Sequence, residues 1–234
     1  SVRAMRKILV ACLAAFALFL ASLALSALGL PSRQIVAAPP PPRAVAAEEV
    51  AEHLAASLRF PTISHSTDPA DLEAEAFAAF RGWFEATYPK LHRTLVREIV
   101  AGDALLYTWQ GTDPSLEPNV LAAHQDVVPA ENLERWTRPP FEGRIEDGFV
   151  WGRGTLDMKG IAVMHMMAMI TLKKMGITPE REIIMLASCD EETGGEKGVK
   201  WMLEKHAADI DAEFVLDEGG LGTRDIFREG KLVY

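Results

Sequence analysis

Side chains that can bind a metal ion or transfer a proton follow three apolar segments of this sequence, and another lies in a glycine-rich segment. They are, in chain order, His124 with Asp126, Asp157, Glu191 with Glu192, and Asp217 with Glu218. Imidazole and carboxylate groups are both ligands of Zn²⁺, and a carboxylate can bridge two ions that lie about 3.5–4 Å apart. The set therefore predicts a metal site with one or two ions and a hydrolytic reaction.

The spacing inside two of these clusters suits the same chemistry. In an extended segment His124 and Asp126 project from the same side, so the carboxylate of Asp126 can hold the second imidazole nitrogen. The adjacent Glu191 and Glu192 point in different directions, so one can bind a metal ion while the other takes a proton from water. Each cluster alone is typical of a solvated turn. Their repetition after successive apolar segments favours a shared site.

The elements that must position these residues alternate along the chain. Strand-type runs occupy residues 119–123, 182–188 and 212–216, and helical spacing is present at residues 47–59, 69–88, 160–175 and 199–206. Two hairpins are expected within residues 94–109 and 144–151, with turns at Gly102-Asp103 and Asp147-Gly148. The alternation predicts an α/β fold, a mixed sheet with helices on both faces. Ligands of such sheets bind outside the carboxyl ends of the strands, where the clusters lie.

Other residues near the clusters receive more modest interpretations. His165 lies on the predicted helix 160–175 and is expected to belong to the core and not to the ligand set. The methionines of this helix are expected to pack, because they cover its whole circumference; they are Met164, Met166, Met167 and Met169. Trp136, Arg138 and Arg153 precede Asp157 and are candidates to shape the side on which a substrate binds.

The N-terminal region differs in character from the rest. Residues 8–30 form an uncharged apolar stretch of 23 residues, which as a helix would cross a hydrocarbon core of roughly 30 Å. Arg3, Arg6 and Lys7 precede it, which predicts a cytoplasmic N-terminus and export of the remainder to the periplasmic or extracellular side. Residues 1–31 are therefore a membrane anchor or a cleaved signal peptide, and both alternatives stay open. Residues 32–46 form a linker rich in proline and alanine.

Charge and cysteine content exclude several classes of protein. The formal net charge is −9, and the first 47 residues contain five basic and no acidic side chains. The remaining residues therefore have a net charge of −14, which is unlike the basic surface of a protein that binds nucleic acid. Two cysteines, Cys12 and Cys189, are too few for a disulfide framework or a cysteine-rich zinc module.

Four sequence segments together indicate a family. AAHQDVVPA, WGRGTLDMKG, CDEETGG and VLDEGG follow one another in this order and resemble the M20 metallopeptidases. The apolar leader and the segment WTRPPFEGRIEDGFVWGRG make the chain most similar to the Gly-X carboxypeptidase and N-acyl-amino-acid hydrolase branch, which is aminoacylase-like. The resemblance covers residues 47–234. It implies that they form the N-terminal part of a zinc-exopeptidase-like catalytic domain with two Zn²⁺ ions per complete active site.

The resemblance also implies a role for each candidate residue. His124 would bind one zinc ion, Asp157 would bridge both ions and Glu192 would bind the other. Glu191 would be the general base, and Asp126 would orient His124. Glu218 would complete the coordination of the first ion, with Asp217 as the alternative because the motif leaves one residue of slack. The implied reaction is hydrolysis of an amide bond in a peptide or an N-acyl amino acid.

The chain departs from the family pattern toward its end. The family has a second histidine ligand late in the catalytic domain and a further histidine, in a lid or dimerisation domain, that contacts the substrate oxyanion. The last histidine here is His206. We therefore expect truncation before the lid or dimerisation domain, through which a homodimer would form. Two alternatives stay open: a catalytically incomplete, membrane-anchored metal-binding fragment, and a hydrolase with a mononuclear site.

Overall fold

The computed structural model describes residues 2–28, 45–66, 68, 72–219, 223–224 and 232–233. The chain divides into two compact units, residues 1–42 and 43–234, which are described separately. The first contains helix α1 (Val2–Leu28). Within it, Met5–Leu28 is long and apolar enough to cross a membrane, a test that signal sequences also pass. Residues 32–44 of the expected linker lie outside the described residues.

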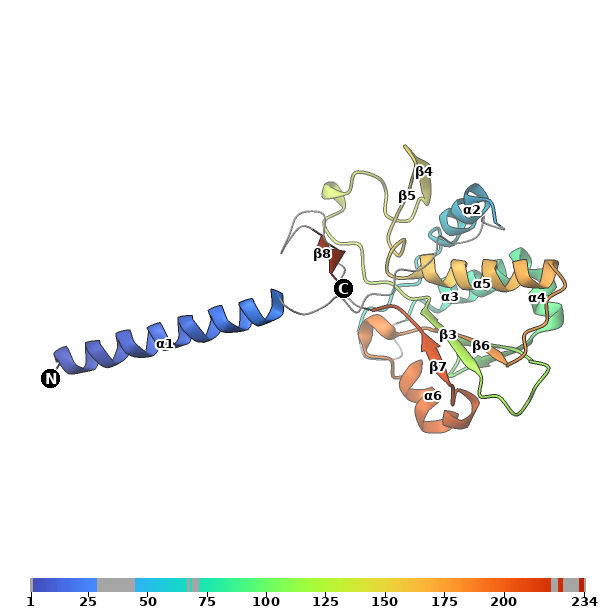
Figure 1. Cartoon of the computed structure of the whole chain (residues 1–234). Helices are drawn as coiled ribbons and strands as arrows, with labels where there is room; N and C mark the ends of the chain where they lie inside the picture. Colours follow the sequence, from blue (N-terminus) through green and yellow to red (C-terminus); the bar gives the residue numbers. More distant parts are fainter. Residues whose placement is uncertain are drawn as a thin grey trace. The chain divides into compact units, whose positions relative to one another are not determined.

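A five-stranded mixed sheet forms the centre of the second unit, with the order β1-β2-β6-β3-β7 (Figure 1). The strands are β1 (Val96–Val100), β2 (Ala104–Trp109), β3 (Asn119–His124), β6 (Ile183–Ser188) and β7 (Phe214–Leu216). β1, β2 and β6 pair antiparallel, whereas β3 runs parallel to both β6 and β7. The mixed sheet expected from the sequence is confirmed.

Helices lie on both faces of this sheet, as expected. They are α2 (Ala47–Ser57), α3 (Ala74–Thr87), α4 (Pro89–Thr94), α5 (Lys159–Lys174) and α6 (Val199–Lys205). In Figure 1, α4 and α5 lie on one side of the strands and α6 lies on the other. Strand β2 shows why both faces are covered. Leu105 packs in the same cluster as Met166 of α5, and its neighbour Leu106 packs in the cluster that contains Met202 of α6.

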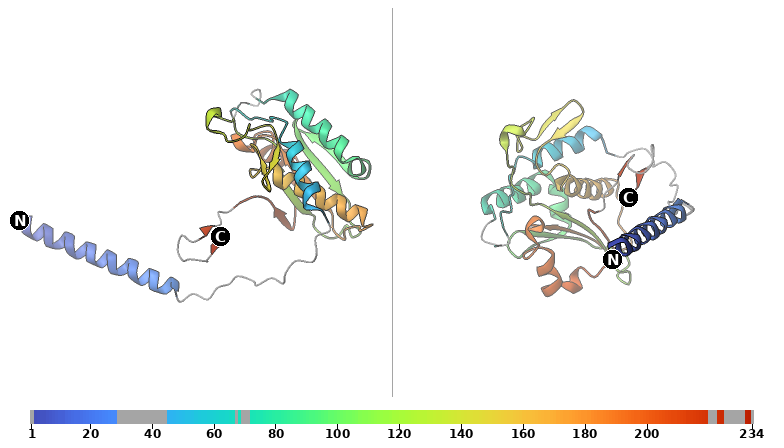
Figure 2. Two further views of the ribbon diagram at one scale, coloured as in Figure 1. Left: turned by 90° about the horizontal axis from the view of Figure 1, so that it is seen from above. Right: turned by 90° about the vertical axis from the view of Figure 1, so that its left-hand side faces the viewer.

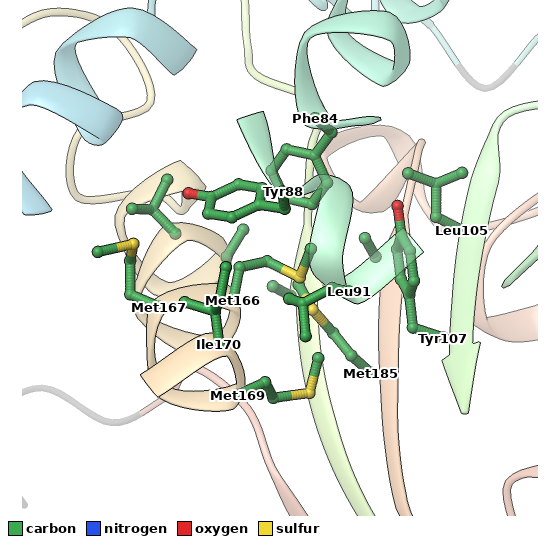
Figure 3. Close-up of a cluster of buried hydrophobic side chains, with 14 of the residues drawn as sticks. Phe84, Tyr88, Leu91, Leu105, Tyr107, Met166, Met167, Met169, Ile170 and Met185 are labelled. Carbon is green, nitrogen blue, oxygen red and sulfur yellow. The ribbon is translucent and has the colours of Figure 1, made fainter. Parts of the chain in front are cut away.

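The larger of the two cores lies between α5 and the sheet (Figure 3). Tyr88, Leu91 and Tyr107 are fully buried there, with the methionines Met166, Met167 and Met169 packed against them. Helix α5 is buried on most of its circumference because α2 packs on it as well. Met164 is the exception to the expected packing, since 52% of it is exposed. The unbranched methionines fill the irregular space between helix and sheet.

Local signals account for most element boundaries. The hairpin of β4 (Arg144–Glu146) and β5 (Phe149–Trp151) forms a separate two-stranded sheet beside α2 (Figure 2). Its turn has positive φ at both Asp147 (53°) and Gly148 (80°), as a two-residue hairpin turn with right-handed twist requires. Two expectations for the elements were wrong. Helix α4 was not foreseen, and the helix predicted over 69–88 begins at Ala74, with residues 69–71 outside the described residues.

Candidate metal centre

The carboxyl ends of three parallel strands bring the candidate residues to one edge of the sheet. His124 is the last residue of β3 and pairs with Ser188, the last residue of β6. Two residues separate Ser188 from a single 3-10 turn, which begins at Glu191 and contains Glu192. β7 pairs with β3 on the other side, and the chain continues from it to Glu218. Ligand-binding residues meet at this edge because neighbouring parallel strands end there together.

Carboxylates from three separate segments surround the Nε2 atom of His124. The distance from Nε2 is 2.9 Å to Oδ1 of Asp157, 3.5 Å to Oε1 of Glu218 and 3.8 Å to Oε2 of Glu191. Two sets of three residues have ligand atoms within 4.8 Å of one another; they are His124, Asp157 and Glu192, and His124, Glu191 and Glu218. One imidazole nitrogen among several carboxylate oxygens is a donor set that fits Zn²⁺.

Asp126 connects the two sides of this cluster. Its side chain is fully buried, and the Nδ1 atom of His124 lies 2.9 Å from its carbonyl oxygen and 3.3 Å from Oδ1. The backbone N–H groups of Glu191 and Glu192 donate to its two carboxylate oxygens, both at 3.1 Å. The Ser64 hydroxyl donates to Oδ2 at 2.7 Å. With Nδ1–H held by Asp126, the Nε2 lone pair of His124 faces the carboxylates.

A buried lysine fixes the position of the loop that contains Asp157. Lys159, the first residue of α5, is 1% exposed, and its ammonium group donates to the carbonyl oxygens of Ser57 at 3.2 Å and Phe60 at 2.6 Å. Gly154, with φ +85°, leaves no room for a side chain, since a Cβ atom would lie 2.8 Å from Cγ1 of Val127. These contacts fix the chain three residues before Asp157, at Gly154, and two residues after it, at Lys159.

Asp217 and Glu218 differ in position. Oδ1 of Asp217 accepts a hydrogen bond from the N–H of Glu218 at 2.9 Å, and no set of candidate ligands among the described residues includes Asp217. Its charge instead acts on His165 of α5, where burial lowers the imidazole pKa and Asp217 opposes that effect. His165 is 7% exposed and outside both candidate sets. Of the two acids, Glu218 lies beside His124.

Sequence reasoning missed two residues that hold this centre together. Ser64 gives no signal in the sequence because it is 62 positions away from Asp126, and only the fold brings its hydroxyl to that carboxylate. Lys159 does leave a signal. Its charge lies between Met158 and the apolar residues of α5, so its side chain must either be buried or interrupt the packed surface of that helix. Here it is buried against the end of α2.

The comparisons with known proteins agree with this geometry. Residues 120–228 match the sequence model of Peptidase family M20/M25/M40. Over 175 residues the chain is 39% identical to "Probable carboxypeptidase S-like 2" of Dictyostelium discoideum, an alignment that covers 73% of this chain and 34% of that protein. The chain belongs to the M20 peptidase family.

Further relatives place the chain within M20. It is 37% identical over 175 residues to the mouse "N-fatty-acyl-amino acid synthase/hydrolase PM20D1", covering 73% of this chain and 34% of that protein. The fold matches the M20 metallo-carboxypeptidase Sso-CP2 of Sulfolobus solfataricus with a TM-score of 0.60 at 23% identity, over 76% of this chain and 38% of that one. The chain thus spans about a third of the length of the curated relatives it matches.

The electrostatics of this M20 centre favour a bound cation. Burial alone disfavours a charged imidazole at His124, but the carboxylates of Asp126 and Asp157 outweigh it and raise the pKa to about 9. Burial, and then the charge of Asp157, raises the pKa of Glu192. Burial also raises the pKa of Glu218, and Asp157 adds to that increase. A divalent cation among these groups would keep the carboxylates ionised and the imidazole neutral.

Proposed function

We propose that this chain provides part of the active site of a metal-dependent hydrolase that cleaves the amide bond of a peptide or an N-acyl amino acid. The observation that carries the proposal is the convergence of Asp157, Glu191 and Glu218 on Nε2 of His124. The printed names of its M20 relatives, a carboxypeptidase and an N-fatty-acyl-amino acid hydrolase, support this substrate class.

The proposed centre would hold two zinc ions. His124, Asp157 and Glu218 would bind one ion, and Asp157 and Glu192 would contribute to the binding of the other. Bound zinc would lower the pKa of a coordinated water molecule and stabilise negative charge on the substrate oxygen. The shared position of Asp157, within 4.8 Å of ligand atoms from both His124 and Glu192, supports its role as the bridge.

Glu191 is the proposed general base. Its side chain is 49% exposed and its Oε2 atom lies 3.8 Å from Nε2 of His124, so it is near the ligands and accessible to water. Its backbone N–H is fixed by Asp126, which gives the side chain a defined starting point. In this position Glu191 can accept a proton from water and later deliver it to the leaving amine.

Metal removal and restoration test the proposal. An enzyme that contains this chain and the complete active site is treated with a chelator until less than about one tenth of an equivalent of zinc remains. Release of free amino acid from N-acyl amino acids and dipeptides is followed before and after zinc is returned. We expect activity to be lost and regained in parallel with the metal content. Hydrolysis that persists in the metal-free protein would contradict the proposal.

One observation favours the alternative of a metal-binding chain without turnover. Both candidate sets depend on the same imidazole, His124, and the described residues contribute no second histidine to either. Three protein ligands with a water molecule form a usual catalytic zinc site, whereas two hold zinc poorly. On this alternative, residues 1–234 alone bind one ion and do not hydrolyse amides.

We also propose that the catalytic part is exported. Arg3, Arg6 and Lys7 precede the apolar helix, an arrangement that keeps the N-terminus in the cytoplasm whether residues 8–30 anchor the protein or are cleaved as a signal peptide. A reporter fused after residue 234 should report the periplasmic or extracellular side. A reporter signal from the cytoplasm would refute export, and the N-terminal residue of the mature protein separates anchor from signal peptide.

A further inference from the structure

Four basic side chains gather where the C-terminal end of α5 meets α4 (Figure 1). This basic patch consists of Lys90 and Arg93 of α4 and of Lys173 and Lys174 of α5. The ammonium group of Lys90 donates to the carbonyl oxygen of Lys173 at 3.2 Å, which joins the two helices. Residues 48–234 have a net charge of −14, because they contain 19 basic and 33 acidic side chains. A cluster of cations on so acidic a unit calls for a physical reason.

Little of this positive charge is neutralised by the protein. Within the residues that the structure describes, one carboxylate pairs with the basic patch: Oε1 of Glu49 lies 3.6 Å from Nζ of Lys174. Lys173 lies over the ring of Trp109, and burial, with the charge of Lys90 in addition, lowers its pKa. The helix dipole favours lysines in the last turn of α5, but it disfavours Lys90 in the first turn of α4. An anion bound here would relieve the repulsion between the two ammonium groups.

Exposed apolar side chains follow the basic patch directly. Met175 is 61% exposed and Ile177 is 42% exposed. Between them Gly176, with φ +75°, ends α5, and its N–H donates to the carbonyl oxygen of Lys173 at 3.2 Å. Both apolar side chains therefore lie at the helix end that carries the lysines. Cationic side chains beside exposed apolar ones are typical of protein surfaces that lie in the interface of a membrane.

The chain enters this unit beside the basic patch. Val45 packs against the larger core, and Glu49, in the first turn of α2, is the residue that pairs with Lys174. Upstream, Met5–Leu28 is long and apolar enough to cross a membrane. Residues 29–44 connect the two, and a segment of that length spans at most about 58 Å. A bilayer that holds the apolar helix is therefore within reach of the patch.

We propose that the basic patch docks this unit on the headgroups of a membrane that contains anionic phospholipid. The four cations contact lipid phosphates, and Met175 and Ile177 insert between the headgroups. The 16 residues of α5 span about 24 Å, with Lys159 near Asp157 at one end and Lys174 at the other. Docking at the patch therefore leaves the metal centre open to solution. The proposal needs neither a bound metal nor turnover, so it stands or fails independently of the proposed hydrolysis.

Fluorescence quenching in lipid nanodiscs tests the docking. The full chain with Met175→Cys is labelled with a fluorophore in a Cys12→Ser background, because Cys189 is buried. The discs contain lipid with a nitroxide on its headgroup, in phosphatidylcholine alone or in a mixture with phosphatidylglycerol. We expect strong quenching in the mixture only, and a loss of quenching as salt shortens the Debye length from about 10 Å to about 3 Å. Leu203→Cys on α6 is the matched control, 59% exposed in the unaltered chain, and should show little quenching in either disc.

Charge variants then assign the docking to the basic patch. Each basic residue near an anionic surface is worth about fivefold, so removing three should lower the ratio of docked to undocked protein about 100-fold. The three substitutions are Lys90→Gln, Arg93→Gln and Lys174→Gln, at exposed positions. The control removes the same charge from another surface and should leave the quenching unchanged, with Lys197→Gln, Lys200→Gln and Lys205→Gln.

Four results would overturn the proposal. Equal quenching of the Met175→Cys label in the two kinds of disc would remove the role of anionic lipid, and an unquenched label in both would mean that lipid does not cover the patch. Equal loss in the two charge variants would reduce the effect to net charge. Inorganic phosphate that releases the label better than sodium chloride of the same ionic strength would make the patch a site for free phosphate and not a membrane contact.

Discussion

Replacing Asp126 by asparagine should destabilise the metal-free protein by about 3–5 kcal/mol. The carboxylate is fully buried, and each of its contacts within the described residues is with a hydrogen-bond donor. Oδ1 lies 3.1 Å from the Glu191 nitrogen and 3.3 Å from Nδ1 of His124. Oδ2 lies 2.7 Å from the Ser64 hydroxyl and 3.1 Å from the Glu192 nitrogen. An asparagine has the same shape but only one acceptor oxygen.

The magnitude follows from the better of the two amide orientations. With the amide oxygen in the place of Oδ1, the Ser64 hydroxyl can reverse and accept from the new NH₂ group. The N–H of Glu192 then faces a donor and loses its acceptor. One lost bond to a charged acceptor costs about 1.5–3 kcal/mol, and the bonds that remain are weaker because their acceptor is neutral. In the opposite orientation the N–H of Glu191 and Nδ1–H of His124 both lose their acceptor, so the loss of stability is larger.

Denaturant unfolding of the metal-free protein measures this free energy, and zinc titration measures the second consequence. Since Asp126 fixes His124 and both glutamate N–H groups, zinc affinity should fall by about 10- to 100-fold. Asp209→Asn is the control, because Asp209 is exposed and pairs only with His206 in the described contacts, so it should cost less than about 1 kcal/mol. A loss below 1 kcal/mol for Asp126→Asn would refute the view that this carboxylate organises the centre.

Four further predictions concern the same residues. In an enzyme with the complete active site, Glu191→Gln should lower amide hydrolysis by about 10²–10⁴-fold with near-normal metal content, whereas Glu192→Gln should lose zinc; exchanged phenotypes would reverse the two roles. Glu218→Gln should weaken zinc binding in a titration and Asp217→Asn should not, because only Glu218 reaches His124. The pKa of His124 is raised to about 9 in the metal-free fold, above about 6.5 in an unfolded chain. The stabilisation that protonated His124 contributes is therefore complete below about pH 6.5 and is lost as the pH rises to about 9. The free energy of unfolding should fall by at most about 3 kcal/mol over that range, which unfolding curves at several pH values measure. A free energy of unfolding that does not fall would contradict the raised pKa. Finally, residues 1–234 alone should bind about one zinc ion tightly and a second weakly, with negligible hydrolysis; two tight equivalents with turnover would show that this chain supplies the missing ligand.

Much of the fold was predictable because its signals are local. The apolar run before His124 and the run before Cys189 became β3 and β6 with boundaries within a residue, and the Asp147-Gly148 turn lies where its sequence requires it. Helix α4 was not predictable, because six residues are too few to show a helical period. The contact of Ser64 with Asp126 was equally hidden, since it depends on packing between distant segments.

The uncertainty between Asp217 and Glu218 shows what information the sequence lacks. Neighbouring side chains in an extended segment point to opposite sides, so the chain after β7 brings one acid, Glu218, to His124, while Asp217 is in neither candidate ligand set of the described residues. Which acid goes which way depends on the register of β7 against β3, where Leu216 pairs with Leu121. A shift of one residue would exchange the two acids without changing a single local propensity. The identity of the residue beside His124 is therefore a property of the assembled sheet and of the pairing order β6-β3-β7.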